Sequence, residues 1–303
     1  MKKLWMILVV AFVCSITVVA AFYHRSVSVP NSTDSLNKPV RIVSLAPNIT
    51  EILFALGLDE EIVAVSSNSD YPPEAVSKNK VGTFWQPNTE AIIASRPDLV
   101  ITLWFEQQKA VADSLSRLGY QVLTLKIEKI EELFTAIQKI GDVTGKHLEA
   151  EELVMDIKNH ISPNEQRTTS DQRRIKVLWV VQAEPLRVAG RNTFVNELIE
   201  LAGGENAISH TIDQYPQIST EELIVCGAEV IIQPLIKSGA MGNNIERQQQ
   251  TAHTFWSKYP NLPAVKNNRI YVVKPDTILR LGPRLGQGVK LIANCLYPDR
   301  NSE

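Results

Sequence analysis

The stretch Asn88-Thr-Glu-Ala-Ile-Ile-Ala-Ser-Arg-Pro-Asp-Leu-Val-Ile101 has a second, altered copy in Ser219-Thr-Glu-Glu-Leu-Ile-Val-Cys-Gly-Ala-Glu-Val-Ile-Ile232. Each copy begins with a residue that caps helices, passes through a short apolar helical pattern to a helix breaker, and ends in an apolar strand. A weaker match aligns residues 50–57 with residues 196–203. The repeat predicts two similar lobes that arose by duplication, although the same order of signals also recurs by chance in α/β proteins.

Strand and helix patterns alternate on both sides of this repeat. In the first half, buried strands are predicted over residues 41–45, 62–65, 99–102 and 121–125. Between the first two, Asn48 and Glu51 have the spacing of a capping box, which predicts a helix that begins at Asn48. Such βα alternation is typical of parallel sheets covered by helices, so the predicted fold class is α/β with two Rossmann-like lobes.

The alternation stops in the middle of the chain. Apolar residues recur at helical spacing from Ile130 to about His160, and Gly141 and Gly145 leave open whether this is one long helix or two in series. We therefore predict an N-terminal α/β lobe over residues 40–128, a linking helical segment over residues 129–168 and a C-terminal α/β lobe over residues 169–303.

The first 22 residues predict export from the cytoplasm. Lys2 and Lys3 precede an apolar run from Leu4 to Phe22, and Val18-Val19-Ala20 suits cleavage after Ala20. The run is also long enough to cross a bilayer, so residues 1–22 are either a signal peptide or an N-terminal anchor. Residues 23–39 are polar and are predicted to be a flexible leader.

Composition and motifs argue against several classes of function. The 303 residues carry a formal net charge of −2 with no long basic run, so we expect no nucleic-acid partner. There is no serine-hydrolase or zinc-protease motif and no histidine or cysteine cluster with zinc spacing. We therefore expect no enzymatic activity, no resident metal and no cofactor. Cys226 and Cys295 either pair in a disulfide or remain buried free thiols.

Several segments, taken in order, resemble the helical-backbone class of periplasmic binding proteins, which serve ABC importers of cobalamin, haem and iron-siderophores. The segments that carry the resemblance are Arg41–Glu51, Ser69–Pro73, Asn88–Glu90, Arg96–Val100, Phe194–Asn206, Pro216–Ser219 and Ala264–Tyr271. Within the class, Ser66–Ala75, Tyr215–Gln217 and Pro283-Arg284 resemble the cobalamin-binding members. The resemblance implies two lobes joined by a long backbone helix, with the ligand in the cleft between them.

The resemblance also implies a monomeric periplasmic receptor that captures cobalamin or another corrinoid and delivers it to a permease dimer driven by an ATPase. The residues expected to contact the ligand are Asn68, Phe84, Trp85, Trp104, Tyr215, Asp276 and Arg280. A corrin is large, flat and partly apolar, which suits aromatic faces and a few hydrogen-bonding groups. Glu90 and Glu221, which the repeat aligns, would dock on arginines of the permease, although a helix dipole also favours acids at these positions.

Two alternatives stay open at this point. Relatives carry an aromatic residue where this chain has Asn68 and a tryptophan where it has Tyr215. Arg280 and Arg284 would suit an anionic iron chelate, so a haem or ferric-siderophore receptor is the first alternative; otherwise these arginines would form salt bridges. The second alternative is a membrane-anchored sensor or structural module with the same fold, which would retain the apolar run of residues 4–22.

Overall fold

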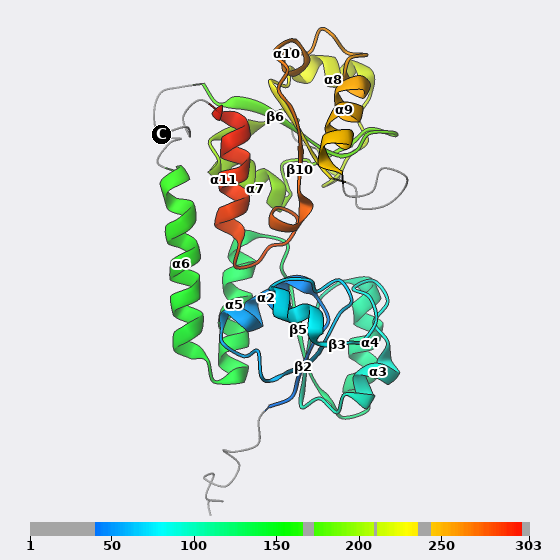
Figure 1. Ribbon diagram of the computed structural model, residues 1–303, viewed down its shortest axis with the longest axis vertical. Coiled ribbons are helices and arrows are strands. Elements are labelled where there is room, and N and C mark those ends of the chain that lie inside the picture. Colours follow the sequence, from blue (N-terminus) through cyan, green and yellow to red (C-terminus); the bar gives the residue numbers. More distant parts are fainter. Residues whose placement is uncertain (1–39, 166–172, 209–210, 236–243, 299–303) are drawn as a thin grey trace, which may run out of the picture. The chain divides into compact units, whose positions relative to one another are not determined.

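The computed structural model describes residues 40–165, 173–208, 211–235 and 244–298, which form two lobes of α/β structure (Figure 1). The predicted export segment and leader, residues 1–39, lie outside the described residues. Within the described part of the chain, no helix is both long and apolar enough to cross a membrane.

The N-terminal lobe is built on a parallel sheet with the strand order β3-β2-β1-β4-β5. Its elements are β1 (Ile42–Ser44), α2 (Pro47–Ala55), β2 (Ile62–Val65), η1 (Pro73–Ser77), β3 (Asn79–Lys80), α3 (Thr89–Ala94), β4 (Leu99–Leu103), α4 (Glu106–Arg117) and β5 (Gln121–Leu125). Successive side chains of a strand point to opposite faces, so Ile42 packs in the same core as Ile49 and Ile52 of α2. Val43 packs in a second core with Ile92 of α3. Helices therefore cover both faces of the sheet.

The C-terminal lobe repeats this plan with the order β10-β9-β6-β7, in which β8 also pairs with β6. Its elements are β6 (Ile175–Gln182), β7 (Arg187–Val188), α7 (Phe194–Leu201), β8 (Gly204–Asn206), α8 (Thr220–Cys226), β9 (Val230–Pro234), α9 (Ile245–Trp256), α10 (Pro263–Lys266), β10 (Ile270–Val273), η3 (Pro275–Thr277) and α11 (Leu285–Leu296). Among the described strands of this lobe, all pairs are parallel except β6 with β7, which is antiparallel.

The two sheets share one topology. The parallel order β2-β1-β4-β5 of the first lobe matches β8-β6-β9-β10 of the second. The aligned stretches of residues 88–101 and 219–232 form equivalent units: α3 leads into β4, and α8 leads into β9. The structure therefore agrees with the duplication that the sequence repeat predicts.

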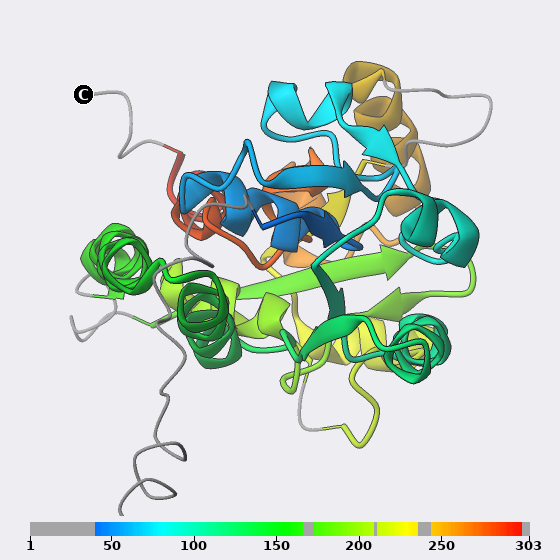
Figure 2. The same ribbon diagram turned by 90° about the horizontal axis from the view of Figure 1, so that it is seen from below.

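Two helices, α5 (Ile130–Thr144) and α6 (His147–Glu165), connect the lobes. Gly145 has a left-handed backbone (φ 74°) that ends α5, so the chain turns back and α6 packs against α5 (Figures 1 and 2). α6 then leads to the second lobe. This settles the question that Gly141 and Gly145 raised: the segment is two helices, and α6 with its 19 residues is the long one.

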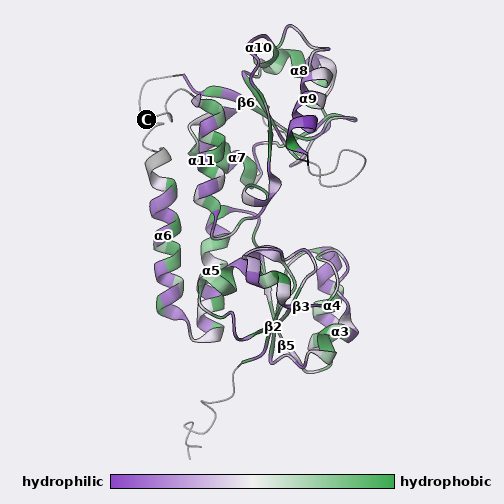
Figure 3. Ribbon diagram, in the orientation of Figure 1, coloured by the Kyte–Doolittle hydropathy of each residue, from purple (hydrophilic) through white to green (hydrophobic). Residues whose placement is uncertain are grey.

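One hydrophobic core runs from the first lobe through α5 and α6 into the second. It includes Ile52 of α2, Ile137 of α5, Ile157 of α6 and Val289 of α11. Hydropathy colouring shows apolar residues along the strands and α7, whereas α6 carries hydrophilic residues on much of its length (Figure 3). The α/β fold class with two lobes and a joining helix is confirmed.

The capping-box prediction at Asn48 is wrong. α2 begins one residue earlier, at Pro47, and its N-cap is Ala46, whose side chain makes no capping bond. The Asn48 amide instead donates to the carbonyl of Leu281 in the other lobe, and Glu51 binds an arginine of that lobe. Asn48 and Glu51 therefore bond to the second lobe, and the capping box does not form.

Candidate functional site

The loops at the carboxyl ends of the strands bring the candidate residues together. In parallel α/β sheets, ligands bind beyond this edge. Asn68 follows β2, Leu103 ends β4 and Ile127 follows β5 in the first lobe. In the second lobe, the segment Leu279–Leu281 follows β10. The two lobes thus present the same functional edge of their sheets to one another.

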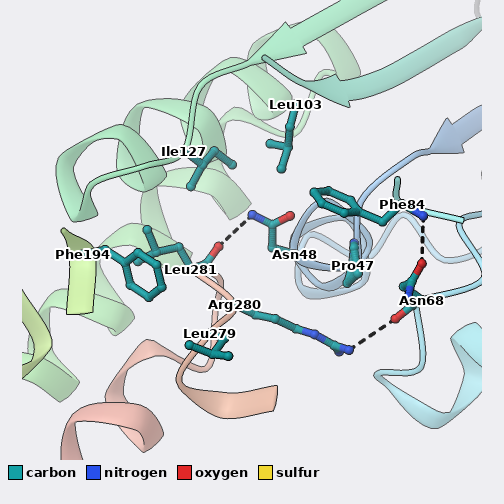
Figure 4. Close-up of a pocket in the computed structure, with 10 residues that line it drawn as sticks. All are labelled: Pro47, Asn48, Asn68, Phe84, Leu103, Ile127, Phe194, Leu279, Arg280 and Leu281. Carbon is teal, nitrogen blue, oxygen red and sulfur yellow. Dashed lines mark hydrogen bonds between the residues drawn. The ribbon is translucent and has the colours of Figure 1, made fainter. Parts of the chain in front are cut away.

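A cavity of about 300 Å³ lies among these loops (Figure 4). Its lining residues come from both lobes and are Pro47, Asn48, Asn68, Phe84, Leu103, Ile127, Phe194, Leu279, Arg280 and Leu281. Most are apolar, and the polar ones are two amides and one guanidinium. Apolar walls with a few fixed polar groups are typical of small-molecule sites.

An aromatic cluster forms the first-lobe side of the site. Phe84 stacks on Phe105 with ring centroids 4.9 Å apart, and Trp85 meets both rings edge-on. Gly82 makes the turn of this loop possible: its φ is 94°, and a Cβ atom there would lie 2.5 Å from the Gln86 carbonyl oxygen. Trp85 remains 58% exposed, so it offers free aromatic surface beside the cavity.

Hydrogen bonds from the Gln108 side chain hold Phe84 of this cluster in place. The side chain is fully buried and donates to the carbonyls of Leu45 and Phe84, both at 3.0 Å. Its Oε1 accepts hydrogen bonds from the Thr102 hydroxyl and from the Leu103 amide. On the other side, Asn68 Oδ1 accepts from the Phe84 amide at 2.8 Å. Phe84 is therefore held by both of its backbone polar groups.

Ion pairs join the lobes at the edge of the cavity. Glu51 on α2 is buried, and Arg284 binds both of its oxygens, at 2.9 and 2.5 Å. Arg280 lies 2.6 Å from Asp70 Oδ1 and 3.5 Å from Glu51 Oε1. The Arg284 guanidinium also stacks on the Tyr71 ring, 3.8 Å from its centroid. These contacts hold the segment after β10 against the first lobe.

The environment of Arg280 keeps it charged. Burial alone would lower the pKa of Arg280, but the hydrogen bond and the charge of Asp70, with the charges of Asp276 and Glu51, outweigh burial and raise that pKa. The guanidinium is therefore a permanent cation that three carboxylates surround. Both Arg280 and Arg284 form salt bridges in the structure, as one of the two interpretations of the sequence predicted.

Of the seven residues expected to contact the ligand, the structure places three on the cavity wall: Asn68, Phe84 and Arg280. Trp85 lies beside the wall through its contact with Phe84. Trp104 directly follows the lining residue Leu103 and is 57% exposed. Tyr215 and Asp276 are not on this wall.

Tyr215 and Asp276 have other surroundings. Burial, and to a lesser extent the negative charge of Glu128, raise the pKa of Tyr215. Asp276 lies 3.5 Å from Arg280 and lines a different cavity in the second lobe, with Arg284 and Cys295. Asp276 therefore contacts the wall of the first cavity through its ion pair with Arg280.

Several lining residues were not predicted from sequence, namely Pro47, Asn48, Leu103, Ile127, Phe194, Leu279 and Leu281. All except Phe194 lie at or just beyond the carboxyl end of a strand or in the loop after β10, so strand position was the signal that could have found them. The contact of Phe105 with Phe84 was not predicted either, because Phe105 directly precedes a helical pattern and its apolar side chain is equally typical of a core residue.

Glu90 and Glu221 occupy equivalent positions in the two lobes. Each is the second residue of its helix, α3 or α8, and each is exposed. The caps are alike: Asn88 and Ser219 each accept a hydrogen bond from a backbone amide three residues on. Hydrogen bonds from its own backbone amide and from Ser219 lower the pKa of Glu221. Both lobes thus display an exposed carboxylate in the first turn of a repeat-related helix.

Cys226 and Cys295 are free and buried. Of the two possibilities that sequence allowed, the structure has the unpaired thiols. Among the described residues, no group of three or more histidine, cysteine or acidic side chains is placed to hold a metal ion.

Comparison with known proteins matches residues 42–277 to a family described as "Periplasmic binding protein". An uncharacterized ABC transporter substrate-binding lipoprotein of Bacillus subtilis is 31% identical over 273 residues, covering 88% of this chain and 82% of that protein. A vitamin B12-binding protein of Vibrio parahaemolyticus is 28% identical, with 84% and 88% covered. The crystal structure of a possible iron-binding periplasmic solute-binding protein from Staphylococcus epidermidis superposes with a TM-score of 0.74 at 27% identity, covering 85% of this chain and 98% of that one.

Proposed function

Since the chain belongs to the periplasmic binding protein family, which comprises solute-binding proteins, we propose that it captures a corrinoid of the vitamin B12 type outside the cytoplasmic membrane. It would deliver this ligand to the permease of an ABC importer, whose ATPase drives uptake. The similarity to a vitamin B12-binding protein of Vibrio parahaemolyticus supports the ligand class.

The observation that carries the proposal is the composition of the inter-lobe cavity. Its wall is apolar and aromatic, and none of its ten described lining residues is a histidine, tyrosine, cysteine or methionine. A haem iron needs such an axial ligand from the protein. A cobalamin brings its own lower axial base, so it requires only surface complementarity and a few hydrogen bonds. Asn48 and Asn68 offer amide groups that suit the amide arms of a corrin.

The ligand would extend beyond the cavity. A corrinoid is bulkier than 300 Å³ of space allows, so part of the ring would lie against the exposed faces of Trp85 and Trp104. Contiguous exposed apolar surface often marks a ligand-binding groove, and the exposed rings of Trp85 and Trp104 would supply such surface to a large flat ligand.

The iron-chelate alternative has one observation in its favour. Arg280 is a cation on the cavity wall, and a possible iron-binding protein shares the fold at 27% identity. An anionic siderophore would need that charge. The titration below separates the two ligands.

Isothermal titration of the chain without residues 1–22 tests the proposal, with cyanocobalamin, haemin, an uncharged ferric trihydroxamate and an anionic ferric tricatecholate as parallel ligands. We expect saturable one-to-one binding of cyanocobalamin at sub-micromolar strength, which is about −8 kcal/mol or better. Binding of an iron complex without binding of cyanocobalamin would exclude the corrinoid as the ligand but keep the assignment to an importer.

Variants assign the binding to the cavity. Phe84→Ala removes an aromatic wall and is expected to weaken cyanocobalamin binding by about 2 kcal/mol, roughly 30-fold. Leu148→Ala is the matched control, because Leu148 is 72% exposed on α6 and does not line the cavity. Equal affinities for the two variants would place the ligand elsewhere.

A further inference from the structure

We propose that Asp70 and Glu51 set the charge selectivity of the inter-lobe cavity: by neutralising Arg280, they make it a site for uncharged chelates and exclude anionic ones. This inference rests on the proposed function, because it names the class of metal chelate that the receptor accepts.

Arg280 is the only cationic residue on the described cavity wall. Its Nη1 lies 2.6 Å from Asp70 and 3.5 Å from Glu51, and its Nη2 lies 3.5 Å from Asp276. Nη2 also donates to the carbonyl of Asn68 at 3.3 Å (Figure 4). The guanidinium of Arg280 therefore already has carboxylate and carbonyl partners within the protein, so few of its N–H donors are left to bind a ligand anion.

The neighbouring guanidinium is equally committed. Arg284 is bound by both oxygens of Glu51 and stacked on Tyr71. Three carboxylates, those of Glu51, Asp70 and Asp276, thus surround two guanidiniums, so the charges at the cavity edge do not favour an anion. An anionic ligand that entered would meet these carboxylates at short range, which costs binding energy.

Asp70 is the residue at which this balance can be changed with least disturbance. Its side chain is about half exposed, whereas that of Glu51 is 2% exposed. Both Asn68, which anchors Phe84, and Asp70, which neutralises Arg280, lie on the loop after β2. One loop therefore shapes the cavity and sets its charge. Selecting a ligand by building repulsion against its competitor is an ordinary way to gain specificity.

The test replaces Asp70 with asparagine and measures quenching of tryptophan fluorescence by two ferric complexes of similar coordination, a trianionic tricatecholate and an uncharged trihydroxamate. The wild-type chain should bind the tricatecholate measurably but far more weakly than the trihydroxamate. We expect Asp70→Asn to strengthen tricatecholate binding at least about tenfold, a free-energy gain of about 1.4 kcal/mol. The affinities of the trihydroxamate and of cyanocobalamin should change much less than that of the tricatecholate, because neither ligand carries the charge that the freed guanidinium attracts. Asp276→Asn should act in the same direction.

Two controls decide the cause of the gain. Asp59→Asn removes the same charge at an exposed position that does not line the cavity, and should give no gain. Asp70→Asn combined with Arg280→Gln should lose the gain, because the released cation is gone.

The inference is overturned if Asp70→Asn gains nothing, if Asp59→Asn gains as much, or if the wild-type chain binds the tricatecholate as tightly as the trihydroxamate. Absence of cyanocobalamin binding by the wild-type chain would instead remove the proposed function and leave the comparison of ferric complexes readable.

Discussion

Arg284 donates hydrogen bonds to both carboxylate oxygens of Glu51, which lies 233 positions earlier in the sequence. Glu51 lies on α2 of the first lobe, and Arg284 directly precedes α11 of the second. Their side chains are 2% and 12% exposed. A carboxylate that deep in the protein is stable only while its partner is present.

Arg284→Met should therefore destabilise the protein strongly. Breaking a buried ion pair by removing one partner costs about 3–5 kcal/mol, because a buried charge is left uncompensated. Urea unfolding measures this loss. The double variant Glu51→Leu with Arg284→Met should be more stable than Arg284→Met alone. Lys146→Met, which removes a partly exposed pair with Glu149, is the control and should change the unfolding midpoint far less. Equal effects of Arg284→Met and Lys146→Met would contradict the prediction.

Gln108→Leu should weaken both stability and ligand binding. The substitution leaves the buried carbonyls of Leu45 and Phe84 without their donor, and each such group costs about 1–3 kcal/mol. Phe84 then loses one of its two anchors, so cyanocobalamin affinity should fall as well. Gln107→Leu is the matched control, since Gln107 is the exposed neighbour on the same helix. Unfolding and titration of the two variants, side by side, check both effects.

Glu90→Gln and Glu221→Gln should each weaken stimulation of the importer's ATPase by the ligand-loaded protein, and the double variant should weaken it most. Two equivalent carboxylates suit a permease dimer by charge complementarity. Ligand affinity should not change, because neither residue lines the cavity. The control is Glu131→Gln, which neutralises another exposed acid in a first helical turn, on α5. Loss of stimulation in Glu131→Gln as well would point to net charge instead of docking.

Both cysteines of the described chain should resist alkylation in the folded protein. Burial raises the pKa of Cys295 to about 12 and also raises that of Cys226. The reactive thiolate forms only as the pH rises towards the pKa, so little of it exists at pH 8. For the chain without residues 1–22, which lacks Cys14, we expect two equivalents of iodoacetamide to react after denaturation without reductant, as counted by intact mass, and almost none before it. No reaction after denaturation would reveal a disulfide instead.

Ligand binding should change the arrangement of the lobes little. One core continues through α5, α6 and α11, and ion pairs of Glu51 and Asp70 join the lobes beside the cavity. A hinge would have to break these contacts. Small-angle scattering should therefore give nearly the same radius of gyration with and without cyanocobalamin. A large compaction would contradict this expectation.

The fold could be predicted because its signals are local. The stretches of residues 88–101 and 219–232 specify a cap, a helix, a breaker and a strand within fourteen residues, and the structure forms α3 with β4 and α8 with β9 there. The candidate site could be predicted only in part. Phe84 and Asn68 were found through resemblance, but no local pattern shows that Glu51 belongs with Arg284. The side chain of Glu51 satisfies a helix-capping rule equally well in the sequence, and only the packing of the lobes decides between the two partners.

The short segment from Lys274 to Arg284 carries three of the ten cavity residues and both arginines that face the first lobe. It leaves the body of the second lobe after β10 and returns at α11. We expect a change confined to this segment to alter the cavity wall and the contacts between the lobes while the two sheets stay intact. Exchange of its eleven consecutive residues, together with the loop after β2 that carries Asp70, is therefore expected to change which ligand the protein binds.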